Sequence, residues 1–307
     1  MAQETLPLVS IVTPVYNGER YVAETVESVL AQDYPRIEYI VIDDGSTDRT
    51  PDVVRRYQGR LRLMQQSNMG QAAALNTGWS LSSGTILGYL SCDDILHPSA
   101  LRKVVQTLLD HPDAIAAFPN CDVIDAQGRR VRRAVARPFD HLESIVDPYC
   151  YIGPGSLLRR SVLDRIGGWK PYLRLAPDRE FWLRAGLMGK ILLCPEVLAC
   201  YRVHGGNLSR CTSRDSAEEY VLVAEEFFAR TDLPAQALAV RCRALGRAYL
   251  IASCYHLRGG RLVACLRAVR MARRHDPRLD WGAISMTLVR EIASGPLQRL
   301  RSWRRTL

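Results

Sequence analysis

Apolar segments alternate with segments of helical periodicity through the first 90 residues of this 307-residue chain. Residues 8–15 are apolar and rich in β-branched side chains, which predicts a buried strand, and residues 20–32 carry apolar side chains at helical spacing. A second apolar strand is predicted at residues 37–42. A helix, a strand, a helix and a strand are then predicted over residues 52–57, 61–64, 71–81 and 85–90. Such repeated units predict the α/β class, in which helices cover both faces of a mostly parallel sheet.

Polar residues directly follow three of these predicted strands. Their sequences are PVYN from Pro14, DDGSTD from Asp43 and SCDD from Ser91. In α/β sheets, ligands bind beyond the carboxyl ends of the strands. We therefore expect the three stretches to gather at one edge of the sheet and to form the binding site.

Two of the three stretches contain adjacent carboxylates, Asp43-Asp44 and Asp93-Asp94. Paired carboxylates beside a buried strand repel each other, so a cation or a donor-rich ligand is expected to offset their charge. Hard divalent ions such as Mg²⁺ prefer carboxylate oxygens and complete their shell with substrate phosphates and water. The second pair therefore suits a metal–diphosphate site, although it could instead cap the helix expected from Pro98. Asp48, before Pro51, has the pattern of a turn residue.

Residues 9–50, from VSIVTPVYNG to VIDDGSTDRT, resemble the opening of the inverting glycosyltransferase family 2, which has the GT-A fold. The resemblance continues to Asp94 and covers about 100 residues. Ser91 stands where the family's D-x-D motif has its first Asp. The chain resembles the branch in which two polar residues precede an Asp-Asp pair, a branch that also carries a Gly-Gln pair such as Gly70-Gln71 and would explain Leu75 where other members have Arg.

The resemblance implies a nucleotide-sugar site in the first half of the chain. Pro14, Tyr16 and Glu19 would lie around the base and ribose, Asp44 would hydrogen-bond the base, and Asp93 would reach the metal and diphosphate. The implied nucleotide-sugar set is Pro14, Tyr16, Glu19, Asp44, Asn68, Gly70, Gln71 and Asp93. The implied metal, Mg²⁺ or Mn²⁺, would be held by Asp93, Asp94 and His204, the last in the sequence YRVH; a lone His is also often structural.

The second half of the chain resembles the family's acceptor-binding half, through GPGS at Gly153, the segment from Arg159 to Trp169, and LAPDREFWLR at Leu175. By this resemblance Asp178 is the general base that removes the proton from the acceptor hydroxyl as its oxygen attacks the anomeric carbon. The alternative is a carboxylate that only stabilises a helix N-terminus, and one side chain can serve both purposes.

The resemblance predicts a metal-dependent, inverting, hexosyltransferase-type glycosyltransferase, with a UDP-sugar as the favoured donor and a saccharide or lipid-linked saccharide as acceptor. Cell-surface polysaccharide or glycolipid synthesis is the expected setting. A nucleotidyltransferase is the main alternative enzyme, but PVYN at Pro14 replaces the Gly-rich phosphate loop of that class. A non-catalytic sugar-nucleotide scaffold would account for Ser91. A phosphorylated response regulator would leave the second acidic pair and Asp178 without a role.

We predict a GT-A domain over residues 1–213 and an Arg-rich helical appendage over residues 214–307. The first divides into a nucleotide-sugar half, residues 1–112, and an acceptor half, residues 113–213. The further strands and helices predicted in the acceptor half lie at residues 114–118, 159–166, 178–188 and 191–193.

Basic charge is concentrated at the C-terminal end of the chain. Residues 241–307 carry 15 Arg and three acidic residues, a net charge of +12, so that residues 1–240 carry −3 of the formal +9. These Arg alternate with Leu, Val and Ala at helical spacing, and aromatic residues for base stacking are sparse, so nucleic acid is not expected as a partner. An anionic membrane surface is the expected contact, with a solvated Arg-rich face as the alternative.

Cysteine usage and hydropathy predict a cytoplasmic protein, with peripheral attachment to the inner face of the membrane as a second expectation. The nine Cys include no C-x-x-C pair, which indicates reduced thiols. The N-terminal residues lack a signal-peptide pattern, and the apolar segment at residues 244–257 is interrupted by Arg247 and falls short of the ~20 residues that span a bilayer.

Overall fold

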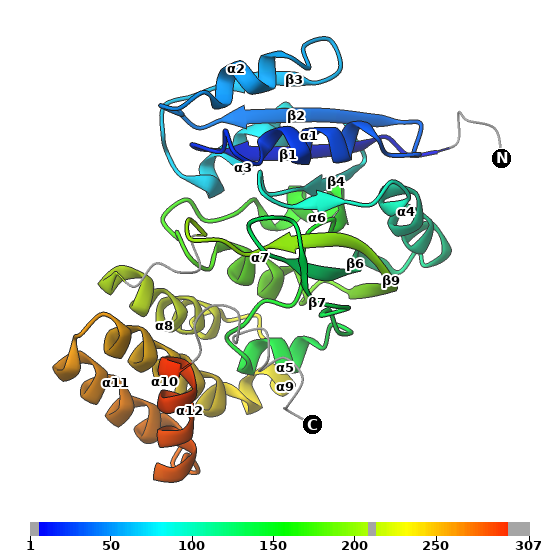
Figure 1. The fold of residues 1–307 in the computed structure, drawn as a ribbon. Helices are drawn as coiled ribbons and strands as arrows, with labels where there is room; N and C mark the ends of the chain where they lie inside the picture. The colour runs from blue at the N-terminus through cyan, green and yellow to red at the C-terminus, as the bar shows by residue number, and fades with distance from the viewer. Residues whose placement is uncertain (1–5, 208–212, 294–307) are drawn as a thin grey trace. The chain divides into compact units, whose positions relative to one another are not determined.

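The computed structural model describes residues 6–207 and 213–293 (Figure 1). Their contacts form two compact units. Unit 1 comprises residues 1–139, 151–172 and 188–202, and unit 2 comprises residues 140–150, 173–187 and 203–307. These groupings follow contacts and do not coincide with the segments on either side of residue 213, so the predicted domain boundary stays a prediction.

The first half of the unit 1 sheet is parallel throughout. Its strands are β1 (Val9–Val15), β2 (Ile37–Asp43), β3 (Arg62–Gln65) and β4 (Ile86–Tyr89), in the spatial order β3-β2-β1-β4 (Figure 1). β1 is buried at every residue and pairs with β2 on one side and β4 on the other. Because β1 is buried on both faces, its apolar run does not alternate with polar residues.

The second half of the sheet mixes parallel and antiparallel pairs. β4 pairs with β8 (Leu157–Arg159), β8 with β6 (Ala114–Ile124), and β6 with β9 (Lys190–Arg202), the last pair being parallel. The two short strands β5 (Ile95–Leu96) and β7 (Arg130–Arg132) pair antiparallel with β9 and β6. The predicted α/β class with helices against the sheet is confirmed, and the parallel arrangement is strongest in the first half.

Five helices belong to unit 1, within the described residues: α1 (Val22–Leu30), α2 (Thr50–Arg55), α3 (Gln71–Leu81), α4 (Ala100–Asp110) and α6 (Arg160–Ile166). α3 packs against β1 and β2, and the helix comes close to the sheet at Gly78. A Cβ atom at Gly78 would lie 2.3 Å from Val12 Cγ1, so only glycine permits this contact. The close packing holds α3 against β1 and β2.

Unit 2 is helical in its described residues, as predicted for the chain beyond residue 215. Its core joins Phe227 and Phe228 with Ala244, Leu245 and Ala248. The apolar run of the longest helix is therefore core, and none of the helices in the described parts of the chain is long and apolar enough to cross a membrane. The helices are α5 (His141–Val146), α7 (Pro177–Ala185), α8 (Arg214–Phe228), α9 (Ala235–Ala239), α10 (Arg241–Arg258), α11 (Leu262–His275) and α12 (Trp281–Ala293).

Candidate functional site

The three polar stretches follow neighbouring parallel strands of unit 1, as the sequence predicts. Val15 at the end of β1 is paired with Asp43 at the end of β2, and Val12 is paired with Tyr89 at the end of β4. The loops after β1, β2 and β4 therefore leave the sheet at the same edge, where ligands bind in α/β folds. Tyr16 is 49% exposed at this edge.

Hydrogen bonds hold the loop after β1 against the loop after β2. The Asn17 side-chain oxygen accepts from Thr47 N at 2.8 Å, and Asn17 N donates to Ser46 Oγ at 2.9 Å. Glu19 accepts from Arg49 N at 3.0 Å and donates its own N–H to Asp48. Glu19 thus helps to join the two loops, and its predicted contact with the nucleotide stays a prediction.

Asp43 and Asp44 are buried, and groups of the protein itself satisfy their carboxylates. Asp43 accepts from Ser46 N and Gln65 Nε2, and Asp44 accepts from Gln66 Nε2, Met69 N and Gly70 N at 2.7 to 2.9 Å. The expectation that a cation or ligand must offset this pair was wrong, because internal N–H donors do so. A carboxylate has about four acceptor positions, and these internal donors occupy three of those of Asp44.

Two glycines allow the segment before α3 to lie against Asp44. Gly45 has a φ of +77°, and a Cβ atom there would lie 2.9 Å from Asn68 N. Gly70 has a φ of +91° and precedes the first residue of α3, Gln71. These conformations strongly favour glycine. They bring Asn68, Gly70 and Gln71 to the β2 loop, with Asn68 exposed.

The second acidic pair is divided between two environments. Asp94 is 3% exposed, and its Oδ1 accepts from Arg202 N at 2.9 Å. Burial, followed by the charge of Asp93, raises the pKa of Asp94 well above the usual carboxyl value. Asp93 is only half-buried. The Asp94 carboxylate is therefore directed to β9, whereas the Asp93 carboxylate is accessible to a ligand.

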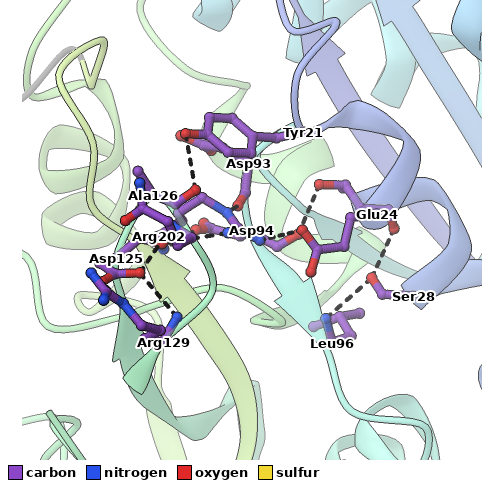
Figure 2. A network of polar contacts seen from close by, with 12 residues as sticks. Tyr21, Glu24, Ser28, Asp93, Asp94, Leu96, Asp125, Ala126, Arg129 and Arg202 are labelled. Carbon is purple, nitrogen blue, oxygen red and sulfur yellow. Dashed lines mark hydrogen bonds and ion pairs between the residues drawn. The ribbon is translucent and has the colours of Figure 1, made fainter. Parts of the chain in front are cut away.

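Arg202, at the end of β9, holds this acidic loop in place (Figure 2). Its guanidinium donates to Asp93 O at 2.8 Å and to Glu24 Oε2 on α1 at 2.5 Å, and it lies over the Tyr21 ring. The side chain is 2% exposed. Thr25 and Ser28 of α1 extend the network, since Thr25 Oγ1 donates to Asp94 O and Ser28 Oγ accepts from Leu96 N. α1 and β9 thus fix the acidic loop from two sides.

The donor set fits a divalent ion held through one protein carboxylate. No group of three or more His, Cys, Asp or Glu suited to a metal occurs among the residues that the structure describes. Asp93 offers a carboxylate at the sheet edge, whereas an Asp94 oxygen is engaged by β9. Mg²⁺ often binds proteins through one or two carboxylates and takes the rest of its shell from phosphates and water. These residues fit such a shared site better than a cage made by the protein alone.

His204 belongs to unit 2, and its ring is oriented by its own loop. Gly206 N donates to His204 Nδ1 at 3.1 Å, which requires Nδ1 to be unprotonated and puts the ring proton on Nε2. In that tautomer Nε2 is a hydrogen-bond donor, which suits a phosphate oxygen. The predicted metal role of His204 stays untested.

Asp178 is the second residue of α7, in unit 2. Its Oδ1 accepts from Arg179 N at 2.7 Å, and the Cys150 thiol also donates to the carboxylate. Burial nevertheless raises the pKa of Asp178 above the usual value. A half-buried carboxylate with a raised pKa at a helix start is a stronger base than a solvated one. Both the structural and the catalytic interpretation of Asp178 are compatible with these contacts.

A buried ion pair stiffens the helix that carries Asp178. Arg184 Nε and Nη2 donate to the two oxygens of Glu180 at 2.6 and 2.7 Å, and both side chains are less than 10% exposed. Arg179 is buried too, and its Nη2 donates to Ile145 O on α5. Such bidentate contacts hold α7 rigidly within unit 2.

The predicted residues from Pro14 to Asp94 lie in unit 1, and Asp178 and His204 lie in unit 2. The residues that sequence reasoning missed are Arg202 and Glu24. Arg202 lies in the motif YRVH, where the His drew attention, and an Arg that ends a strand was the available signal. Glu24 carried no signal, because a Glu in the first turn of a helix is ordinary.

Comparison with known proteins agrees with this architecture. An uncharacterised glycosyltransferase of Rickettsia prowazekii is 31% identical over 222 residues, covering 70% of this chain and 69% of the relative. S. aureus TarS in complex with UDP-GlcNAc superposes with a TM-score of 0.65 at 19% identity, over 87% of this chain and 92% of that one.

A second solved structure is the mannosyltransferase PcManGT of Pyrobaculum calidifontis, in complex with GDP-Man and Mn²⁺. It has a TM-score of 0.63 at 21% identity, over 98% of this chain and 86% of that one. The fold is therefore that of GT-A transferases. Residues 10–167 match the family described as Glycosyl transferase family 2, and the chain belongs to that family of glycosyltransferases.

Proposed function

We propose that this glycosyltransferase moves a sugar from a nucleoside-diphosphate donor, with a UDP-sugar favoured, to an acceptor hydroxyl with inversion at the anomeric carbon. The observation that carries the proposal is the state of Asp178, a half-buried carboxylate with a raised pKa at the start of a rigid helix. A base of this kind takes the proton from the acceptor hydroxyl while the hydroxyl oxygen displaces the nucleoside diphosphate in one in-line step. No covalent intermediate on the protein is then needed.

In unit 1, the proposed donor site uses the residues at the carboxyl edge of the sheet. Tyr16 and the remaining acceptor position of Asp44 would contact the base and ribose. Asp93 would hold Mg²⁺ or Mn²⁺, which when bound would neutralise charge on the departing diphosphate. Asp94 would support the Asp93 loop through Arg202 N. The role proposed for His204, which belongs to unit 2, is to donate from Nε2 to a phosphate oxygen.

The remaining donor-site residues would act through the backbone and the loop before α3. The exposed Asn68 and the half-buried Gln71 would contact the donor, and Gly70 would allow its close approach. Pro14 and Glu19 would shape the pocket around the ribose. PcManGT with GDP-Man and Mn²⁺, and TarS with UDP-GlcNAc, support a nucleotide-sugar donor and a divalent ion for this fold.

The experiment is a panel of UDP- and GDP-sugars with Mg²⁺ or Mn²⁺, monitored by release of nucleoside diphosphate and by NMR of the product's anomeric configuration. We expect one donor to be cleaved preferentially and an acceptor to be joined with inverted configuration. Retention of configuration would remove Asp178 from the proposed role. Pyrophosphate as the product would favour the nucleotidyltransferase, and donor binding without any cleavage would favour the scaffold.

A saccharide or lipid-linked acceptor in cell-surface polysaccharide or glycolipid synthesis is proposed as the setting. An O-antigen biosynthesis protein of Myxococcus xanthus, 30% identical over 189 residues that cover 58% of this chain and 14% of that protein, supports this. We also propose that α11 rests on an anionic membrane surface at the cytoplasmic face. Its exposed side combines Leu262, Val263 and Leu266 with three arginines, Arg267, Arg270 and Arg274.

A further inference from the structure

A buried carboxylate on α8 holds the segment of chain that leads into α7. Glu219 is 6% exposed, and its carboxylate accepts hydrogen bonds from three consecutive backbone N–H groups of the same unit. Arg174 N donates to Oε1 at 2.9 Å, and Leu175 N and Ala176 N donate to Oε2 at 2.6 and 3.1 Å. Hydrogen bonds to an ionised acceptor are stronger than those between neutral groups, so Glu219 holds this segment firmly.

The segment that Glu219 holds ends two residues before Asp178, the proposed base. Ala176 is the N-cap of α7, and its side chain makes no capping hydrogen bond. In the common capping box, a Glu within the first turn of the same helix accepts from the N-cap N–H. Here Glu219 of another helix does so. The position of the Asp178 carboxylate at the start of α7 therefore depends on a side chain of α8.

Apolar packing brings α8 and the start of α7 together but does not orient the backbone there. Ala176 belongs to a buried cluster whose other members come from α8 and α10, namely Ala217, Tyr220, Ile251 and Tyr255. Apolar contacts are non-directional, whereas hydrogen bonds weaken steeply when they are misaligned. The three hydrogen bonds to Glu219 are therefore the contacts that fix how the chain enters α7.

We propose that Glu219 is a positioning residue for sugar transfer, because it holds the start of α7 where Asp178 can meet the acceptor hydroxyl. The inference deepens the proposed function and rests on it, since it takes Asp178 as the base. A general base has to lie within hydrogen-bond reach of the proton that it removes. A displacement of about 1 Å can lower the rate about 100-fold, so Glu219 affects turnover without touching the substrate.

The test compares Glu219→Gln with a matched control in the full chain. Gln keeps the size of the side chain and one oxygen, but it turns the other acceptor into a donor that faces a backbone N–H. The control is Glu218→Gln, the same change at the neighbouring exposed residue of α8. Each variant is made alone and together with Asp178→Asn. Transfer kinetics, donor titration and thermal unfolding are measured for all of them.

We expect Glu219→Gln to lower kcat for transfer by about tenfold or more, while donor affinity and the donor KM change by less than about twofold. Together with Asp178→Asn, the Glu219 change should have little further effect, because a residue that acts through the base has no effect once the base is absent. A loss of stability alone would instead lower transfer by the same factor in both backgrounds. Glu218→Gln should match its parent in both.

Hydrogen exchange gives a second readout that does not depend on activity. In Glu219→Gln, the backbone N–H groups of Arg174, Leu175 and Ala176 lose part of their acceptor. Their exchange in the folded protein should be faster by about tenfold or more, and Glu218→Gln should leave it unchanged. Mass spectrometry of the peptide that contains these three residues provides the measurement.

The outcomes separate the positioning role from the proposed function. Unchanged kcat or unchanged exchange in Glu219→Gln would overturn the positioning role, and so would an equal loss of transfer with and without Asp178. The proposed function would stand in these cases if Asp178→Asn alone abolished transfer. Normal turnover in Asp178→Asn, or no transfer by the unsubstituted chain with any donor, would contradict the proposed function and overturn the positioning role that rests on it.

Discussion

At the scale of single residues, the proposed catalytic role of Asp178 can be tested by a substitution. Replacing it with Asn keeps the size of the side chain and an oxygen for Arg179 N, but removes the base. We expect transfer to fall by about 10²- to 10⁴-fold with donor binding nearly unchanged. Steady-state kinetics and donor titration would check this, and normal turnover in the variant would refute the assignment.

The raised pKa of Asp178 also predicts how the pH affects activity and stability. The midpoint of the acid limb of the kcat/KM pH profile should lie above the ordinary Asp pKa of about 3.9. Because the folded protein holds the Asp178 proton more tightly than the unfolded chain does, this group's contribution to the free energy of unfolding decreases as the pH rises from the unfolded value through the folded pKa. Asp178→Asn should therefore raise Tm at pH 7 and leave it unchanged near pH 3. Calorimetry that showed a lower Tm at pH 7 would contradict this.

The two carboxylates of the second acidic pair are expected to differ as metal ligands. Asp93→Asn removes the accessible carboxylate and should raise the half-maximal Mg²⁺ or Mn²⁺ concentration by about tenfold or more. Asp94→Asn keeps an oxygen for Arg202 N and should raise it by less. Metal titrations of donor cleavage in both variants provide the measurement. A larger effect at Asp94 would show that the ligand assignment is reversed.

At the scale of elements, Arg202 joins β9, α1 and the acidic loop in one contact set. Arg202→Met would leave Asp93 O without its donor and Glu24 without its ion pair, while Glu24 itself is half exposed and can hydrate. We expect a loss of about 2–4 kcal/mol in the free energy of unfolding. Arg55→Gln, which breaks an exposed pair with Asp52, should cost about 0.5 kcal/mol or less. Urea unfolding of both variants tests the contrast, and equal losses would contradict it.

The local pattern of apolar residues explains how much of the architecture was predictable. β1, β2 and α3 were predicted within about two residues, because their apolar pattern is local and continuous. β6 extends to Ile124, beyond the predicted segment, since Asn120 and Asp122 interrupt its apolar run although both are buried in the strand. Their partners, Ala136 N and Ala134 N, lie more than ten residues away.

The site residues likewise divide into those that a local sequence pattern indicates and those that only distant contacts explain. The loops after the strands were predictable because each lies next to an apolar run in the sequence. The contact between Asp94 and Arg202 joins residues 108 positions apart, so no local pattern could indicate it. The internal donors to Asp44, from Gln66 to Gly70, likewise depend on how β2 and α3 pack, and not on the sequence around Asp44.

At the scale of the whole molecule, the C-terminal helices cannot be removed to test their function. The core of unit 2 joins Phe227 and Phe228 of α8 with Ala244, Leu245 and Ala248 of α10. A chain that ended near residue 240 would expose this apolar surface and could bind vesicles for that reason alone. Membrane attachment has to be tested by changing exposed charges in the full chain.

The exposed side of α11 offers such a test. A triple change of Arg267, Arg270 and Arg274 to Glu should weaken binding to phosphatidylglycerol vesicles by roughly 100-fold or more, since each basic residue near an anionic surface contributes about 1 kcal/mol. The matched control changes the exposed Arg55, Arg56 and Arg60 of unit 1 to Glu, which alters the net charge by the same amount. Co-sedimentation is measured at low and high salt. Attachment through α11 would make the α11 variant bind more weakly than the control variant, although the two have equal net charge. General charge attraction would weaken both variants equally. If the two triple variants bound equally, α11 would not be the attachment surface, and its exposed leucines and arginines would form only a solvated face.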